Sequence, residues 1–388
     1  MRVLYSAIDV GIPAFHGGAS HVQESVSALE KLGHEVFLVS QGGWGKPLAE
    51  KKRNVSIYRV PVFFEHGFLR VLNLWLFSIP LFIYLLSFKV VDFVYERNRV
   101  FGNCAVVLGK ILGKKCVIEM NEPLVQAAEQ EFGHSPKFYF VKWWFYFTAR
   151  FADVVTVTHK CMAFGLPKEK ILKIHYGANP EKFYPARRNP AIVKRFSLKT
   201  GKTVFYSGSF REWHALRETI EAAAIAVKRD RSLKFLFAGR GEKFQEAKKL
   251  AEEKGLRRNV VFLGRVPFSR MNSYINSSDT CLALFSCYYP LFRKCSYFYS
   301  ALKVHEYKAC GKPVIATKMG NLRKMVKHGK NGLLVSNSPK EIAAAVLKLS
   351  RSSALRKRMG KRNRTEVLEK YNWIAVTEKV LRAVKARE

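Results

Sequence analysis

The chain has 388 residues, of which 48% are hydrophobic, so it can bury the cores of two or three domains and is not a wholly disordered protein. Lysine and arginine outnumber aspartate and glutamate by 67 to 30, which gives a formal net charge of +37. Such a charge attracts polyanions such as anionic lipid headgroups and phosphorylated substrates, whereas no nucleic-acid-binding module is recognisable and no nucleic-acid partner is expected.

The seven cysteines show no CxxC pattern, which indicates reduced, mostly buried thiols in a cytosolic chain. No signal peptide is expected, because residues 2–6 already have the pattern of a strand.

The first half of the chain alternates apolar runs with helical patterns, which is typical of a doubly wound parallel sheet. The expected strands are residues 3–6, 34–39, 55–60, 91–95, 116–119, 154–157 and 171–175. The first crossover begins at His16-Gly17-Gly18-Ala19-Ser20, where glycines either let a ligand approach the start of a helix or simply make a tight turn.

Residues 71–88 carry no charge and reach ~27 Å as a helix, barely the hydrocarbon thickness of a bilayer. A single span would separate the strands on either side of it, which are expected in one sheet. We therefore expect a helix pair broken at Pro80, partly buried and with its outer face in a membrane interface. A second apolar-aromatic stretch, residues 138–147, has basic flanks that suit a lipid headgroup layer, although interior packing also fits.

A polar, proline-containing link at residues 186–190 predicts a domain boundary. A second strand–helix series follows, with strands expected at residues 203–206, 235–238, 260–263, 281–285, 314–317 and 333–335. A capping box is expected at Ser338 and Glu341, and a last helix from Thr365. The expected fold is two doubly wound, Rossmann-like α/β domains facing across a cleft, where ligands bind at the carboxyl ends of the strands.

The stretch from Tyr297 to Thr317 predicts a short helix, residues 301–308, followed by a buried strand. Ser300 is expected to cap the helix. Lys303 in its first turn and Glu306 on the same face suit a nucleoside diphosphate and its ribose, although an ordinary solvated ion pair fits the spacing equally well. Glycine-containing turns beside basic residues follow three strands of this half, at residues 207–211, 239–242 and 264–266.

The chain resembles the retaining, nucleotide-sugar-dependent glycosyltransferases of family 4 (glycosyl transferases group 1), which have the GT-B fold. The resemblance covers nearly the whole chain and is most specific at YFYSALKVHEYKACGKPVIAT. The other matching segments are GGASHVQESVSALEKLGHEV, IHYGANPEKFYP, SGSFREWHALRETIEAA and YNWIAV.

The resemblance implies that Glu306 holds the ribose hydroxyls, and that backbone N–H groups of Ala301, Leu302 and Lys303 hold the diphosphate. Gly18 matches the glycine that approaches the same phosphates. The remaining residues implied on the donor side are Gly208, Ser209, Arg211, His214, Arg240, Val266 and Ser300. The expected catalytic residues are Glu306, Lys303 and Asn121. The residues expected on the acceptor side are His16, Glu96, Arg97 and Glu122.

The sequence also departs from the family pattern. The first glutamate of the family's pair falls at Phe298, and the phosphate-binding Arg and Lys fall at Ser209 and His214, where Arg211 and Lys303 are the available substitutes. The histidine that often follows the middle strand of the first domain falls at Asn121, a trait shared with members that have an EVN-PL-like stretch.

The implied domains are residues 1–188 for the acceptor, residues 189–365 for the nucleotide-sugar donor, and residues 366–388 as a helix that returns to the first domain. The absence of a DxD motif predicts no metal and no cofactor beyond the donor substrate. In a retaining enzyme the leaving phosphate helps to deprotonate the acceptor; an inverting one needs a carboxylate base, for which Asp9 and Glu122 are candidates.

We therefore expect a hexosyltransferase that is peripheral on the inner face of a membrane and acts on a lipid-linked or surface-glycan acceptor. A sugar-nucleotide 2-epimerase of the same fold and a catalytically silent nucleotide-sugar-binding scaffold are the alternatives.

Overall fold

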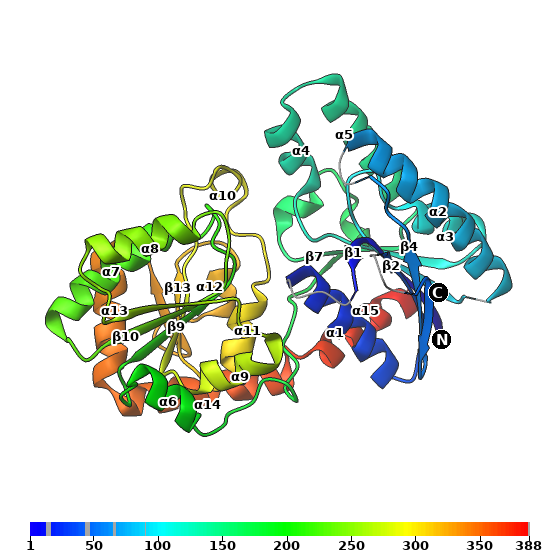
Figure 1. Cartoon of the computed structure of the whole chain (residues 1–388). Helices are drawn as coiled ribbons and strands as arrows, with labels where there is room; N and C mark the ends of the chain where they lie inside the picture. The colour runs from blue at the N-terminus through cyan, green and yellow to red at the C-terminus, as the bar shows by residue number, and fades with distance from the viewer. Residues whose placement is uncertain (13–16, 43–46, 65–66, 90, 387–388) are drawn as a thin grey trace. The chain divides into compact units, whose positions relative to one another are not determined.

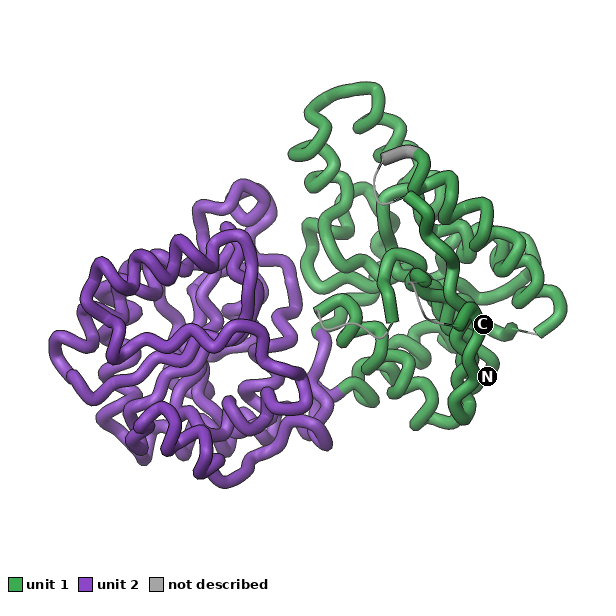
Figure 2. The backbone as a smooth tube through the Cα atoms, in the orientation of Figure 1, with its two compact units in different colours: residues 1–175, 373–388 green, residues 176–372 purple. Residues whose placement is uncertain are grey.

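The computed structural model describes residues 1–12, 17–42, 47–64, 67–89 and 91–386 (Figure 1). The chain forms two units: the first contains residues 1–175 and 373–388, and the second contains residues 176–372 (Figure 2). Each unit is built on one sheet, and the chain passes from one unit to the other twice.

The boundaries differ from those expected from the sequence. The link near residue 188 lies inside the second unit, because the segment before it is hydrogen-bonded there: the amides of Tyr184 and Ala186 donate to Asn272 Oδ1 and Asn276 Oδ1 over 3.1 and 2.9 Å. At the other end, residues 366–372 stay with the second unit, and the first unit resumes at Trp373.

The first unit has an eight-stranded sheet in the order β3-β4-β2-β1-β5-β6-β7-β8, parallel except for the β3–β4 pair. Its strands are β1 (Arg2–Gly11), β2 (Glu35–Gln41), β3 (Ala49–Lys52), β4 (Val55–Val60), β5 (Phe93–Arg97), β6 (Lys115–Glu119), β7 (Val154–Val157) and β8 (Ile171–Lys173). Only β3 was not expected. Its residues are Ala-Glu-Lys-Lys, which have no apolar alternation, and its pairing comes from the sheet edge.

The helices of this unit are α1 (Gly17–Lys31), α2 (Gly67–Phe88), α3 (Cys104–Ile111), α4 (Leu124–Phe132), α5 (Pro136–Ala149) and α15 (Trp373–Lys385). Helix α15 packs against α1, α2 against α3, and α4 against α5 (Figure 1). The expected single helix from Thr365 is two helices, because α14 (Ser353–Glu369) ends before the crossing to the first unit and α15 begins after it.

Helix α2 is continuous, so the expected break at Pro80 is wrong. A buried row, Leu74, Ser78, Phe82 and Leu85, follows helical spacing along one side of α2, so tertiary packing holds the helix together across the proline. Within the described residues, the Leu69–Phe88 part of α2 is the one stretch that is long and apolar enough to cross a membrane. The strands on either side of it, β4 and β5, belong to the same sheet, as expected, and this argues against a crossing.

The second unit has a six-stranded parallel sheet in the order β11-β10-β9-β12-β13-β14. Its strands are β9 (Thr203–Ser207), β10 (Lys234–Ala238), β11 (Val260–Gly264), β12 (Thr280–Ala283), β13 (Val314–Thr317) and β14 (Gly332–Val335). The two sheets confirm the expected pair of Rossmann-like α/β folds.

The helices of the second unit are α6 (Pro190–Phe196), α7 (Leu216–Arg229), α8 (Phe244–Glu253), α9 (Phe268–Asn276), α10 (Pro290–Cys295), α11 (Leu302–Ala309), α12 (Leu322–Met325), α13 (Pro339–Arg351) and α14. Helix α7 packs against α8 and α13 (Figure 1). The capping box expected before α13 does not form, because the Glu341 carboxylate accepts the amide of Ser336 (2.9 Å) and Ser338 makes no side-chain cap.

A buried ion pair attaches α11 to α14 in the second unit. The side chain of Lys308 is fully buried, and its Nζ donates to Glu366 Oε2 over 2.6 Å and to the Met325 carbonyl over 3.1 Å. Burial lowers the pKa of Lys308, and the Glu366 charge opposes that shift. Asn331 Nδ2 donates to the same carboxylate oxygen over 2.9 Å, so Glu366 Oε2 accepts hydrogen bonds from both an ammonium and an amide group.

Removing Glu366 alone should therefore be costly. We expect Glu366→Ala to lower the free energy of unfolding by about 3 kcal/mol, because a buried ammonium loses its counter-charge. Adding Lys308→Met should recover most of the loss, and the exposed Glu369→Ala should change little. Urea unfolding of the four proteins measures this, and a loss that Lys308→Met does not recover contradicts the ion-pair explanation.

Candidate active site

The amino end of α11 is left without a side-chain cap. Ser300 does not cap the helix as expected: its Oγ accepts the amide of Tyr176 over 2.9 Å and lies 3.4 Å from His305 Nε2. The N-cap is Ala301, which has no side chain to offer. In the described part of the chain, the N–H groups of Ala301, Leu302 and Lys303 make no hydrogen bond, and such groups are a ready anion site.

The ammonium group of Lys303 is buried beside this helix end. Nζ lies 4.6 Å from the ring centroid of Tyr206 and 5.1 Å from that of Phe285, and it has no hydrogen-bond partner among the described residues. Burial lowers the pKa of Lys303 to about 7, and the nearby Glu306 charge opposes that shift. A buried cation held only by aromatic faces is poised to accept an anionic partner.

His214 lies against the same aromatic rings. Its ring is 4.8 Å from that of Phe285 and 5.8 Å from that of Tyr206, and neither ring nitrogen has a hydrogen-bond partner among the described residues. Burial, together with the charge of Lys303, holds the pKa of His214 well below its usual value. His214 and the ammonium of Lys303 therefore lie against the same two rings, those of Tyr206 and Phe285, and Lys303 belongs to the first turn of α11.

The loops after β9 and β10, at the carboxyl ends of the strands, require glycine where they approach Lys303. A Cβ at Gly208 would collide with Lys303 Nζ, and one at Gly239 would collide with the Gly208 carbonyl. Both have φ values that disfavour other residues, +153° and +135°. The Gly208 amide donates to the Ala238 carbonyl (3.0 Å) and the Gly239 amide to the Gly264 carbonyl (2.7 Å), so the loops after β9, β10 and β11 form one rim.

The other residues expected to bind the donor lie on or near this rim, and they differ in exposure and in the contacts they make. Ser209 accepts a hydrogen bond from Tyr206 through its carbonyl (3.0 Å). Arg211 and Arg240 are exposed, and their guanidinium groups lie 5.3 Å from the rings of Trp213 and Phe244. Val266 is half-buried in the loop after β11. Nothing in the structure assigns these four residues a ligand.

Glu306 is half-buried, and it belongs to the same helix as Lys303. Phe298, which stands where the family has its first glutamate, is completely buried: its ring packs 4.3 Å from Tyr299 and 5.5 Å from Phe292. Its carbonyl accepts a hydrogen bond from Asn321 over 2.7 Å. This side chain is therefore part of the core.

In the first unit, a buried carboxylate organises the carboxyl end of the sheet. Glu119 accepts from Tyr95 Oη over 2.8 Å and from Asn121 Nδ2 over 3.0 Å, and lies 3.0 Å from His21 Nε2. Arg97 Nη1 lies 3.6 Å away. Burial alone would raise the pKa of Glu119, but His21 and Arg97 outweigh it and lower that pKa to about 2. The expected catalytic Asn121 is thus held by Glu119.

The sequence interpretation missed Glu119 and His21, because both lie in segments taken as ordinary strand and helix. The available signal was a glutamate at the end of an otherwise apolar strand, where an ionised group requires partners. Around this network lie two other carboxylates: Asp9 Oδ2 is 4.0 Å from Arg97 Nε, and burial raises the pKa of Glu122, with Arg97 opposing.

Glu96, expected on the acceptor side, has a structural role instead. Its carboxylate is buried and accepts the amide of Val106 (2.9 Å) and the hydroxyl of Ser6 (3.2 Å), so it caps the start of α3. Burial raises its pKa to about 7. Gly18 lies in the first turn of α1, and His16 lies outside the described residues.

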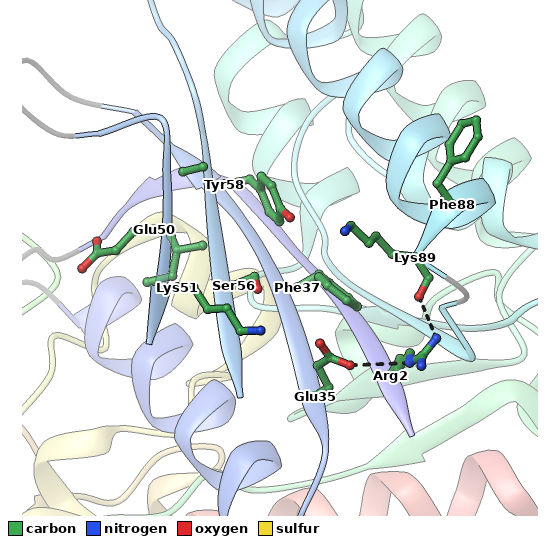
Figure 3. A pocket seen from close by; sticks show the side chains of 11 residues that line it. Arg2, Glu35, Phe37, Glu50, Lys51, Ser56, Tyr58, Phe88 and Lys89 are labelled. Carbon is green, nitrogen blue, oxygen red and sulfur yellow. Dashed lines mark hydrogen bonds and ion pairs between the residues drawn. The ribbon is translucent and has the colours of Figure 1, made fainter. Parts of the chain in front are cut away.

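A pocket of about 470 Å³ in the first unit is lined by residues of β1, β2, β3 and β4 and by the end of α2 (Figure 3). Its lining includes Arg2 and Glu35, which begin β1 and β2 and form an ion pair at 3.5 Å, and Lys89 at the end of α2. None of the residues that line this pocket belongs to the network around Glu119.

Two family models match the chain. Residues 15–182 match the model described as Glycosyltransferase Family 4, and residues 189–366 match the one described as Glycosyl transferases group 1. An uncharacterised glycosyltransferase of Methanocaldococcus jannaschii is 25% identical over 382 residues, which cover 93% of both proteins.

Two solved structures show the same fold over the whole chain. Sucrose-phosphate synthase from Thermosynechococcus elongatus superposes with a TM-score of 0.75 at 18% identity, covering 100% of both chains. Anabaena HepE, solved in complex with UDP and glucose, superposes with a TM-score of 0.71 at 16% identity, also covering 100% of both chains.

The pKa of Lys303 leads to a pH prediction for the binding of a nucleoside diphosphate, for which UDP serves as the probe. An anion beside Nζ should raise that pKa above its free value of about 7, so binding takes up a proton. Between pH 7 and 9 the affinity should fall by roughly tenfold per pH unit until the bound-state pKa is passed. Calorimetry in buffers of different ionisation enthalpy measures both quantities.

Lys303→Arg is the matched control, since arginine stays charged throughout this range. Its affinity should be nearly independent of pH above 7. If the unsubstituted protein also binds UDP with no pH dependence and no proton uptake, the ammonium of Lys303 does not meet the ligand.

Proposed function

The chain belongs to the family 4 glycosyltransferases (glycosyl transferases group 1), a retaining family with the GT-B fold that uses nucleotide-sugar donors, and we propose that it transfers a hexose to a lipid-linked or surface-glycan acceptor. The second unit binds the donor and the first unit binds the acceptor in this proposal. The observation that carries it is the unpartnered, buried Lys303 beside the uncapped end of α11.

The chemical task is the departure of a sugar from a nucleoside diphosphate. Negative charge grows on the leaving β-phosphate, and fixed dipoles and a cation next to it lower the barrier. The free N–H groups of Ala301, Leu302 and Lys303 supply the dipoles, and the ammonium of Lys303 supplies the cation. The lowered pKa of His214 keeps its ring neutral, and a neutral imidazole can donate its one N–H to a phosphate oxygen.

Lys303 supplies the positive charge that a divalent ion supplies elsewhere, and the sequence has no DxD motif. We therefore propose transfer without a metal ion. Glu306, on the same helix as Lys303, is proposed to accept the ribose hydroxyls, because a half-buried carboxylate is a strong acceptor.

On the first unit, we propose that the acceptor lies by Asp9, Arg97, Asn121 and Glu122, at the carboxyl ends of β1, β5 and β6. The buried Glu119 fixes Asn121, and its neighbour Arg97 contributes positive charge. In front-face transfer the leaving phosphate takes the acceptor proton, so Glu122 has only to orient the hydroxyl.

We further propose that the first unit docks on an anionic membrane. Helices α2 and α5 carry the two apolar segments (Figure 1). They contact each other through Trp75 and Trp144, whose rings lie 5.2 Å apart. Apolar side chains exposed on the two helices are Leu69, Leu72, Leu76, Phe77, Ile83, Tyr84, Phe88, Tyr139, Phe140 and Trp143.

Basic residues accompany these side chains. Lys89 Nζ lies 5.9 Å from the ring of Tyr84, and Lys142 Nζ lies 6.0 Å from that of Phe138. Aromatic rings beside cations at the edge of an apolar face suit the boundary between acyl chains and anionic headgroups. A peripheral position on the inner face of a membrane fits a lipid-linked acceptor.

A catalytically silent scaffold is the second candidate, and one observation favours it: Phe298 offers the sugar no polar group. The proposal for an enzyme is tested by incubating the purified protein with UDP-, GDP- and ADP-hexoses and lipid-linked or glycan acceptors. We expect transfer with retained anomeric configuration from one donor class. Nucleotide binding without turnover supports the scaffold.

Glu306→Ala should weaken binding of the preferred nucleotide by roughly tenfold or more, because a charged acceptor of ribose hydroxyls is lost. The exposed Glu369→Ala on α14 is the matched control and should bind normally. Calorimetry with the free nucleotide measures both, and an unchanged affinity of a folded Glu306→Ala protein refutes the assignment.

The membrane proposal predicts peripheral association. Carbonate or high-salt washing should release the protein from membranes, and Leu76→Ser with Trp143→Ser should lower its partition onto phosphatidylglycerol vesicles by roughly tenfold or more. The matched control is Tyr184→Ser with Tyr288→Ser, which removes exposed rings from the second unit. Retention after washing would instead identify an integral protein.

A further inference from the structure

A pocket of about 650 Å³ in the second unit is lined by basic side chains. It lies where α7 and α8 end and where β10 and β11 begin. The charged residues in its lining are Lys228, Arg231, Lys234, Lys254 and Arg258, and its lining contains no aspartate or glutamate.

This pocket is separate from the candidate donor site. Gly239 follows β10 and Gly264 ends β11, so both lie at the carboxyl ends of these strands, whereas the pocket lies at the amino ends of the same strands. Five residues of extended strand separate the two ends, which is roughly 16 Å. A ligand in the pocket would therefore not touch Lys303 or His214.

The acidic residues near the pocket are engaged with other cations. Asp230 pairs with Lys202 at 2.7 Å, and Glu252 pairs with Arg257 at 3.6 Å. Glu253 lies 4.0 Å from Lys249. Within the described part of the chain, none of the five basic side chains of the pocket has an ion-pair partner, so their charges add in one concave space.

Local helix electrostatics explain only part of this cluster. A cation near the carboxyl end of a helix is stabilised by the helix dipole, which accounts for Lys228 on α7 and Lys254 at the end of α8. Arg231 and Arg258 lie in loops and Lys234 begins a strand, so the dipoles do not explain them.

The backbone around the pocket is held in place before any ligand binds. Asn259 Nδ2 donates to the carbonyls of Arg231 (3.0 Å) and Leu233 (2.7 Å), and Lys234 Nζ donates to the carbonyl of Arg258. These bonds join the loop after α7 to the loop before β11. The two arginines are therefore carried on segments that are fixed to each other.

We propose that this pocket binds a small polyanion that carries two or more phosphoryl groups. Two arginine guanidinium groups match phosphate oxygens in pairs, and three lysines add point charge around them. The apolar part of the lining, Ala224, Val227 and Leu256, leaves room for the body of such a molecule. A soluble oligophosphate and the phosphates of a lipid headgroup share this chemistry.

The test uses Arg231→Ser with Arg258→Ser in the full chain, because the carbonyls that accept from Asn259 and Lys234 remain in the variant. Arg351→Ser with Arg358→Ser removes two exposed arginines elsewhere in the unit and is the matched control. Tripolyphosphate is titrated by calorimetry into each protein in the presence of a saturating concentration of whichever of UDP, GDP or ADP binds the unsubstituted protein, so that the donor site is occupied.

The unsubstituted protein should bind one tripolyphosphate, the pocket variant should bind it roughly tenfold or more weakly, and the control should match the unsubstituted protein. Equal affinity in the pocket variant overturns the proposal, as does an equal loss in the control. The separate titrations of UDP, GDP and ADP report on the donor site, so a failure of the proposed donor site is distinguished from a failure of this pocket.

A second arm measures binding to phosphatidylglycerol and phosphatidylcholine vesicles. If tripolyphosphate does not bind but phosphatidylglycerol vesicles do, with a loss in the pocket variant and none in the control, lipid headgroups are the source of the phosphoryl groups. If neither probe responds to the pocket substitutions, the proposal is wrong.

Discussion

A buried ammonium group with no counter-charge in contact is the constraint on which the candidate active site depends. Lys303 Nζ is covered by the rings of Tyr206 and Phe285, and burial lowers its pKa to about 7. Keeping an ionisable group in such a place costs stability, and an arriving phosphate reverses that cost. The surrounding elements serve this position: Gly208 clears the space for Nζ, and the uncapped α11 presents its N–H groups beside it.

The two ends of the second unit use positive charge differently. At the carboxyl ends of the strands, Lys303 Nζ and the His214 ring nitrogens are buried and have no hydrogen-bond partner among the described residues, and we propose that they meet one anion. At the amino ends, five basic side chains surround an open pocket on a backbone that is already hydrogen-bonded together. Part of the net positive charge of the chain is thus gathered around a pocket that the transfer of a sugar from a nucleotide does not require.

Much of the fold could be predicted because it depends on local pattern. The strands at Val55–Val60, Val154–Val157 and Val314–Thr317 are apolar runs bounded by polar turns, and they form where expected. The errors come from partners that lie far along the chain. The hydroxyl of Ser300 accepts a hydrogen bond from the amide of Tyr176 instead of capping α11, and the buried carboxylate of Glu96 caps α3. Likewise, the network around Glu119 needs His21, which no local pattern connects to it.

The most direct test of the central claim is a crystal structure of the protein with UDP bound. We expect oxygens of the β-phosphate within about 3 Å of Lys303 Nζ and of the backbone N–H groups at the start of α11. A diphosphate bound elsewhere, with Lys303 still enclosed by Tyr206 and Phe285 and without an anionic partner, would contradict it.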